Sequence, residues 1–111
     1  MKKGYNIYMK YVRIFKALSN ETRLNILMWL KSPNDNFPQQ NHPLEDNDFV
    51  NGVCVGSIKD KSGLSQSTTS EYLSILQHAG FLECKRIGQW TYFRRNEQFI
   101  KELSNWIGKE L

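Results

Sequence analysis

The chain has 111 residues, of which 40% are hydrophobic and 13% aromatic, and its net charge is +4. This length accommodates one domain with a hydrophobic core and no second one, and the composition excludes wholesale disorder. No apolar run approaches the roughly 20 residues that cross a bilayer. The first residues lack the apolar stretch of a secretory signal, and two cysteines do not form a disulfide framework. We therefore expect a cytoplasmic protein with a single domain over residues 1–111.

Charge is distributed unevenly along the chain. The segment 32–51 holds four acidic residues and no basic one, so the remaining residues carry a net charge of +8. A basic body with one acidic segment favours a polyanionic partner, although solvated lysines alone also produce such a balance.

The N-terminal half reads as two helices and a loop. Apolar residues at helical spacing predict a helix over residues 7–18. Ser19-Asn20 then supplies an N-cap for a second helix over 21–31, which is apolar almost all round and ends before Pro33. Residues 32–51 contain all three prolines and five asparagines, which predicts an acidic surface loop. Phe37, Leu44 and Phe49 are expected to anchor this loop.

The C-terminal half reads as short strands and three helices. Residues 53–55 predict a strand and residues 56–61 a short helix. Gly63 suits a turn with positive φ, Ser65 caps a helix over 66–79, and Gly80 ends it. Residues 81–86 and 90–95 predict a β-hairpin, and a last helix follows from about 96 to 108. The expected fold is mainly α with a small β-hairpin wing: a winged helix-turn-helix of about five helices and two to three short strands.

One side of the helix at 66–79 carries short polar side chains. At 100° per residue its apolar residues share one side with Thr68 and Thr69, whereas the serine hydroxyls and glutamine amides occupy the other. A helix that enters the major groove needs small side chains for close approach and Gln or Ser groups for the base edges. We predict base contacts from Gln66, Ser67 and Ser70, with Thr69 at the groove edge. The alternative is a Ser/Thr-rich surface helix without a role.

The hairpin that follows is basic. Arg86, Gln89, Arg94 and Arg95 flank or form its turn, and we assign them to a wing that contacts phosphates. Trp90 and Tyr92 alternate with them, and we expect one of the two to pack against the domain.

Two stretches carry a family resemblance. Residues 15–24 read FKALSNETRL and residues 64–73 read LSQSTTSEYL; both resemble motifs of the ArsR/SmtB winged-helix repressors. The resemblance covers nearly the whole chain except residues 32–51. The stretches GVCV at 52–55 and RIGQWT at 86–91 resemble a NolR-like subgroup with an extended loop before the DNA-binding motif.

The resemblance implies a homodimeric repressor that binds an inverted-repeat, palindromic operator on double-stranded DNA. It assigns the interface to the first helix and to a C-terminal dimerisation helix at 96–110. Apolar stripes on both helices agree with this, although packing within one chain explains them equally well. The predicted interface residues are Tyr8, Tyr11, Phe15, Phe99, Leu103 and Trp106.

A metal- or thiol-responsive repressor of the same family is the alternative. The family's paired-cysteine motif is reduced here to Cys54, because Gly56 stands where the second thiolate would be. Cys54, Cys84, His42 and His78 are scattered over loop, strand and helix, so we predict no metal site and no cofactor. The strand with Cys54 is expected to pair with strand 90–95, which places Cys84 one strand further away and too distant for a disulfide.

Two classes outside transcriptional regulation fit the sequence less well. An enzyme is not predicted, because the sequence contains no Gly-rich phosphate loop and no nucleophile–base pair, and the chain is short for a substrate cavity. A winged helix that binds only proteins predicts a neutral or acidic wing and bulky anchors on the helix face, neither of which the sequence shows.

Overall fold

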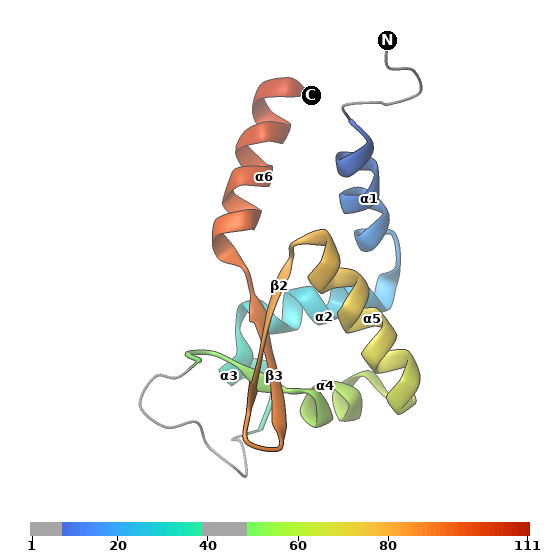
Figure 1. Ribbon diagram of the computed structural model, residues 1–111, viewed down its shortest axis with the longest axis vertical. Coiled ribbons are helices and arrows are strands. Elements are labelled where there is room, and N and C mark those ends of the chain that lie inside the picture. Colours follow the sequence, from blue (N-terminus) through green and yellow to red (C-terminus); the bar gives the residue numbers. More distant parts are fainter. Residues whose placement is uncertain (1–7, 39–48) are drawn as a thin grey trace.

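The computed structural model describes residues 8–38 and 49–111. Figure 1 shows the course of the chain, with helices and strands in this order: α1 (Met9–Leu18), α2 (Glu21–Lys31), α3 (Pro33–Asn36), β1 (Val53–Cys54), α4 (Val55–Ser62), α5 (Gln66–Ala79), β2 (Leu82–Ile87), β3 (Trp90–Arg95) and α6 (Glu97–Glu110). The mainly helical fold with a hairpin is the one predicted.

Local signals set the helix ends. Asn20 Oδ1 accepts a hydrogen bond from the Arg23 N–H at 2.9 Å and begins α2. Ser65 Oγ accepts from the Thr68 N–H at 3.2 Å and begins α5. Gly80 ends α5 with φ +109°, and a Cβ there would lie 2.7 Å from Cε1 of Phe99. The predicted bounds of α2, α5 and β3 are confirmed, and those of the two helices follow from these adjacent residues.

The segment 32–51 departs from the predicted loop. Its first residues form the short helix α3, in which Pro33 occupies the first turn, where a missing N–H costs nothing. Phe37 and Phe49 are 9% and 5% exposed and anchor the segment as expected. The third predicted anchor, Leu44, lies outside the described residues.

Three antiparallel strands form one sheet in the order β1-β3-β2. The register pairs Ile87 with Trp90 at the turn and Leu82 with Arg95 at the other end, which we call the base of the hairpin. Strand β1 pairs Cys54 with Tyr92. The central strand is therefore β3, as the placement of the two cysteines assumed.

The core lies where the helices meet the sheet. Ile26, Ile58, Leu73 and Leu76 are fully buried, and Phe81 is 2% exposed. The chain extends over 54 × 29 × 25 Å, with α1 and α6 at one end and the hairpin turn at the other (Figure 1). Among the described residues, no helix is both long and apolar enough to span a membrane.

Candidate nucleic-acid interface

Helices α4 and α5 form a helix-turn-helix. Gly63, with φ +72°, ends α4, and its N–H donates to the Lys59 carbonyl at 3.0 Å. Ser65 then starts α5 two residues later. Buried Ile58 on α4 and Leu73 on α5 join the same core cluster, which fixes the two helices against each other. The N-terminal end of α5 consequently stands free at the end of the molecule that also bears the hairpin turn (Figure 1).

The exposed side of α5 carries three of the predicted reading residues. Gln66, Ser67 and Ser70 are all exposed, and Gln66 Nε2 donates to Ser70 Oγ at 3.2 Å. Thr69 is fully buried, and its Oγ1 donates to the Ser65 carbonyl at 2.8 Å. Its predicted place at the groove edge is therefore wrong: the hydroxyl bonds one turn back along the helix and the methyl group joins the core.

A hollow of about 210 Å³ separates α5 from the hairpin. Its lining includes Ser74 and Gln77, which the predicted site omitted, and Thr91 of β3. The spacing gives the reason: positions 66, 70, 74 and 77 follow one another by three or four residues and share a helix face. The polar face of α5 thus continues for most of the helix and looks toward the wing.

The wing tip holds Arg86 and Gln89, both exposed. Gly88, with φ +62°, makes the tight turn, and Arg86 Nε donates to its carbonyl at 3.2 Å. Arg86 pairs across the strands with Thr91, so both side chains project from the same face of the sheet. Since Thr91 lines the hollow beside α5, the Arg86 guanidinium stands on the wing face that looks toward the polar helix.

Arg94 and Arg95 lie at the base of the hairpin, and their predicted place in the wing is wrong. Arg94 Nε lies 2.8 Å from Glu83 Oε1, and its guanidinium lies over the Phe49 ring at 4.1 Å. Arg95 Nε lies 2.8 Å from Glu97 Oε2, and its Nη1 donates to the Leu27 carbonyl at 3.3 Å.

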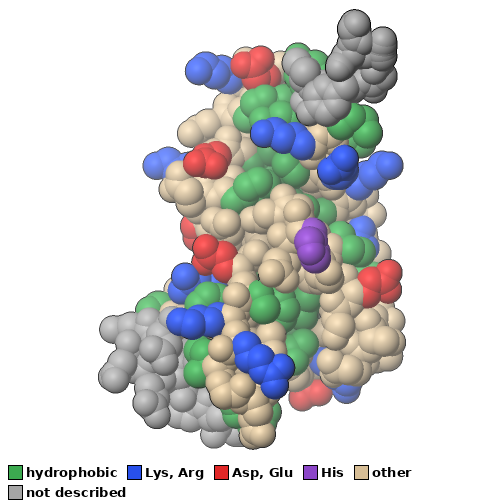
Figure 2. All heavy atoms as spheres, in the orientation of Figure 1, with side chains coloured by type: hydrophobic (Ala, Val, Ile, Leu, Met, Phe, Trp, Pro, Cys, Tyr) green, Lys and Arg blue, Asp and Glu red, His purple; other side chains and the backbone are tan. Residues whose placement is uncertain are grey.

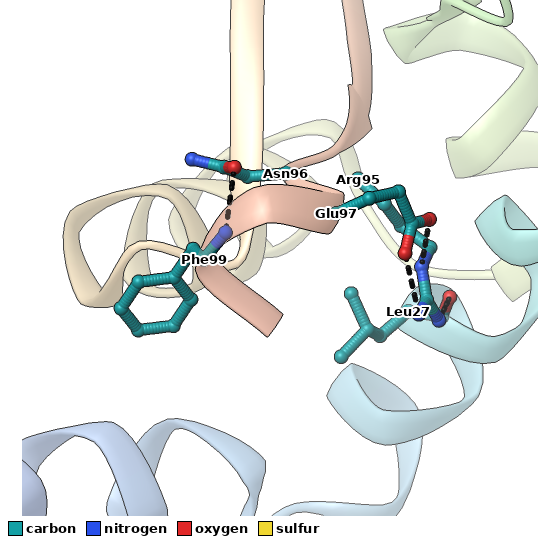
Figure 3. Close-up of polar contacts among 5 residues, drawn as sticks. All are labelled: Leu27, Arg95, Asn96, Glu97 and Phe99. Carbon is teal, nitrogen blue, oxygen red and sulfur yellow. Dashed lines mark hydrogen bonds and ion pairs between the residues drawn. The ribbon is translucent and has the colours of Figure 1, made fainter. Parts of the chain in front are cut away.

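Figure 3 shows the Arg95 side chain between Glu97 and Leu27, next to the cap in which Asn96 Oδ1 accepts from the Phe99 N–H at 3.0 Å. The Arg95 side chain is 9% exposed. These contacts join the base of the hairpin to α2 and α6, so Arg95 stabilises the fold.

Of the two wing aromatics, one packs inward as predicted. Tyr92 is 1% exposed and forms a small cluster with Phe49 and Cys54, whereas Trp90 is 40% exposed. Burial, together with the neighbouring Cys54 thiol, raises the pKa of Tyr92.

The two cysteines are not placed to form a disulfide. Cys54 pairs with Tyr92 and Cys84 with the next residue, Phe93, so the thiols stand on opposite faces and two strands apart. Burial raises the pKa of the Cys84 thiol, which disfavours the reactive thiolate. Within residues 8–38 and 49–111, no three His, Cys, Asp or Glu side chains gather in a way that holds a metal ion. His42, one of the four candidate ligands, lies outside these ranges.

The aromatic stripes of α1 and α6 meet within one chain. Tyr11 stacks on Trp106 with ring centroids 3.5 Å apart and planes inclined by 8°, and Tyr8 and Phe15 approach the same indole. Figure 2 shows hydrophobic side chains over the end of the molecule that these helices form.

Two predicted interface residues pack on the core of this chain, Leu103 as a buried residue and Phe99 as a partly buried one. Leu103 is 8% exposed, and Phe99 packs edge-on against Phe81 at 5.2 Å. The exposed large apolar residues at this end of the molecule are Tyr8, Met9, Val12, Ile107 and Leu111, of which only Tyr8 is among the predicted interface residues. The interface itself stays a prediction.

A helix-turn-helix followed directly by a hairpin with a basic tip defines a class, the winged helix-turn-helix DNA-binding domains. Among solved structures, the chain is similar to the homodimeric winged helix-turn-helix DNA-binding domain of Mb0332 from Mycobacterium bovis, a possible ArsR-family transcriptional regulator. The TM-score is 0.62 at 23% identity, with 97% of this chain and 87% of that chain covered.

Sequence comparison narrows the class. Over 103 residues the chain is 45% identical to the uncharacterized HTH-type transcriptional regulator YbzH of Bacillus subtilis, covering 93% of this chain and all of that one. It is 28% identical to the putative arsenical resistance operon repressor ArsR2 of Halobacterium salinarum, covering 78% and 59%. No protein-family model matches. The chain belongs to the HTH-type transcriptional regulators and has the winged helix-turn-helix fold, and it is similar to repressors of the ArsR family. Its place in the NolR-like subgroup stays a prediction.

Proposed function

We propose that this single-domain regulator acts in the cytoplasm as a homodimeric repressor that binds an inverted-repeat operator. The observation that carries the proposal is the exposed polar face of α5 beside the basic wing tip. Gln66, Ser67 and Ser70 supply donors and acceptors to base edges, and Arg86 and Gln89 hold the phosphate backbone. Related proteins that are named repressors support the direction of regulation.

The homodimer is supported by the exposed apolar side chains of α1 and α6. Tyr8 and Val12 are 52% and 43% exposed, and Leu111 is 82% exposed. They lie beside the Tyr11–Trp106 stack, around a groove of about 270 Å³. A second copy that covers this face removes it from water, and the related Mycobacterium bovis domain is a homodimer. Two-fold symmetry then places the recognition helices about 34 Å apart, one turn of duplex.

A metal- or thiol-responsive repressor remains the alternative, and the geometry favours it less. The cysteines stand two strands apart on opposite faces. A disulfide switch between them would need the sheet to rearrange.

Selection of bound duplexes from a random library tests the proposal. We expect selected sequences with two-fold symmetry and half-site centres about 10 base pairs apart. Gln66→Ala should weaken binding of the selected duplex by about 1–3 kcal/mol and relax the preference at one base pair of each half-site. Gln98→Ala is the matched control, because Gln98 is an exposed glutamine on α6, bonded only to Glu102 in the same helix. Unchanged discrimination in Gln66→Ala would refute the assigned reading face.

A further inference from the structure

One arginine ties the end of the first helix to the start of the second. From the first turn of α2, Arg23 Nε donates to the Ala17 carbonyl at 2.8 Å and Arg23 Nη2 donates to the Lys16 carbonyl at 3.1 Å. Both carbonyls belong to the last turn of α1, where helix carbonyls lack partners within the helix and attract positive charge. Arg23 therefore caps α1 from its neighbour.

The same arginine also reaches the recognition helix. Its guanidinium lies over the ring of Tyr72 on α5, 5.1 Å from the centroid. Asn20 completes the contact: its Nδ2 donates to Tyr72 Oη at 3.4 Å, while its Oδ1 caps α2 at the Arg23 N–H. We call Asn20, Arg23 and Tyr72 the three-helix junction, because they join α1, α2 and α5.

The junction holds α5 from behind. At 100° per residue, Tyr72 lies roughly 240° around the helix from Gln66 and roughly 200° from Ser70. The reading face is thus free, while the opposite side is fastened to α1. Under the proposed function α1 belongs to the dimerisation layer, so the junction sits between that layer and the helix that enters the groove.

A small tilt of α5 at the three-helix junction displaces its reading end by a distance comparable to the rise of one base pair. Gln66 lies six residues from Tyr72, about 9 Å along the helix at 1.5 Å per residue. A tilt of about 10° at Tyr72 therefore moves Gln66 by about 1.5 Å. Two-fold symmetry doubles this to about 3 Å between the two reading ends, close to the 3.4 Å rise of one base pair.

We propose that Arg23 and Tyr72 are positioning residues that set the angle of the recognition helix to the dimerisation layer, and thereby the half-site spacing that the dimer accepts. The inference rests on the proposed homodimer. Neither residue contacts DNA; each acts through the orientation of α5.

The test uses the 111-residue chain and duplexes that it selects from a random library. Each selected duplex is also made with one base pair added or removed between the half-sites, and as an isolated half-site. The readout is the ratio of affinities for the selected and the altered spacing. Arg23→Lys keeps the charge, but a single ammonium does not bond two carbonyls and cover an aromatic ring as a planar guanidinium does.

We expect Arg23→Lys to lower the spacing ratio roughly five- to tenfold, within the usual range of coupling between sites. Binding to the isolated half-site should stay unchanged. Tyr72→Leu should act in the same direction. Tyr72→Phe keeps the ring under the guanidinium and should therefore largely retain the native ratio. Arg13→Lys, the same substitution at an exposed position of α1, is the control and should leave the ratio as it is.

Each possible result either supports the positioning role or overturns it. A ratio that stays unchanged in Arg23→Lys and Tyr72→Leu, with only a lower Tm, makes these residues merely structural and overturns the positioning role. Selected duplexes that lack two-fold symmetry overturn the proposed function, and this inference with it. If Arg23→Lys does not fold, Tyr72→Leu alone decides: it removes the ring beneath the Arg23 guanidinium, and the spacing ratio should still fall.

Discussion

Arg95 and Arg86 lie on the same hairpin, and the structure predicts opposite consequences when each is replaced by alanine. Arg95 is buried at the base, where it bonds the Leu27 carbonyl and pairs with Glu97. Arg86 stands exposed at the tip. We expect Arg95→Ala to reduce stability and leave DNA binding by the folded protein intact, and Arg86→Ala to do the reverse.

The size of the Arg95→Ala effect follows from its two contacts. A hydrogen bond from a charged group contributes about 1.5–3 kcal/mol. The Glu97 side chain is 65% exposed, so solvent screens that pair, which adds less than about 1 kcal/mol. We expect a loss of about 2–3 kcal/mol in the free energy of unfolding, and a Tm lower by about 10–20 °C at a fixed protein concentration.

Thermal unfolding followed by circular dichroism measures the first effect. Fluorescence anisotropy with a labelled duplex over a series of salt concentrations, at a temperature where each variant is folded, measures the second. Arg86→Ala should lower the slope of log affinity against log salt by about one unit, because one phosphate contact is lost. An Arg95→Ala variant with an unchanged Tm but a lower salt slope would show that the base of the hairpin contacts DNA, and would refute this division of roles.

Three further predictions concern stability and redox chemistry. Gly80→Ala should destabilise the fold by about 2 kcal/mol or more in urea unfolding, because φ is +109° and the new Cβ meets the Phe99 ring; a neutral result would mean that Phe99 moves aside freely. Ser65→Ala should cost about 1 kcal/mol through the lost N-cap of α5, whereas Ser65→Asp should retain most of the stability. Oxidation with diamide should leave the thiols of Cys54 and Cys84 unlinked within one chain, as mass spectrometry after alkylation would show; an intramolecular disulfide would contradict the strand order.

The hairpin shows how far the position of a candidate DNA-contacting residue follows from the sequence. A two-residue turn at Gly88 and Gln89 places Arg86 beside the tip, whereas Arg95 lies six residues beyond the turn, about 20 Å away at 3.3 Å per residue. The number of residues from the turn therefore places Arg95 at the base of the hairpin and away from its tip. Basic residue type alone does not distinguish the tip of a hairpin from its base.

Local chemistry alone predicts most of the elements, α3 excepted, and the polar face of α5. Caps and stops such as Asn20, Ser65 and Gly80 act within a few residues, so the bounds of α2 and α5 follow from local chemistry. Helical periodicity likewise separates the exposed Gln66 and Ser70 from the apolar side of α5, without reference to any other element.

Which partner each side chain contacts depends on how the elements pack together. Periodicity shows that α6 has an apolar stripe, but not that Leu103 is buried in its own chain while Ile107 is exposed. Nor does it show that Arg23 spans three helices. These outcomes depend on contacts between residues far apart in the chain, and the packing of whole elements fixes such contacts where local propensity does not.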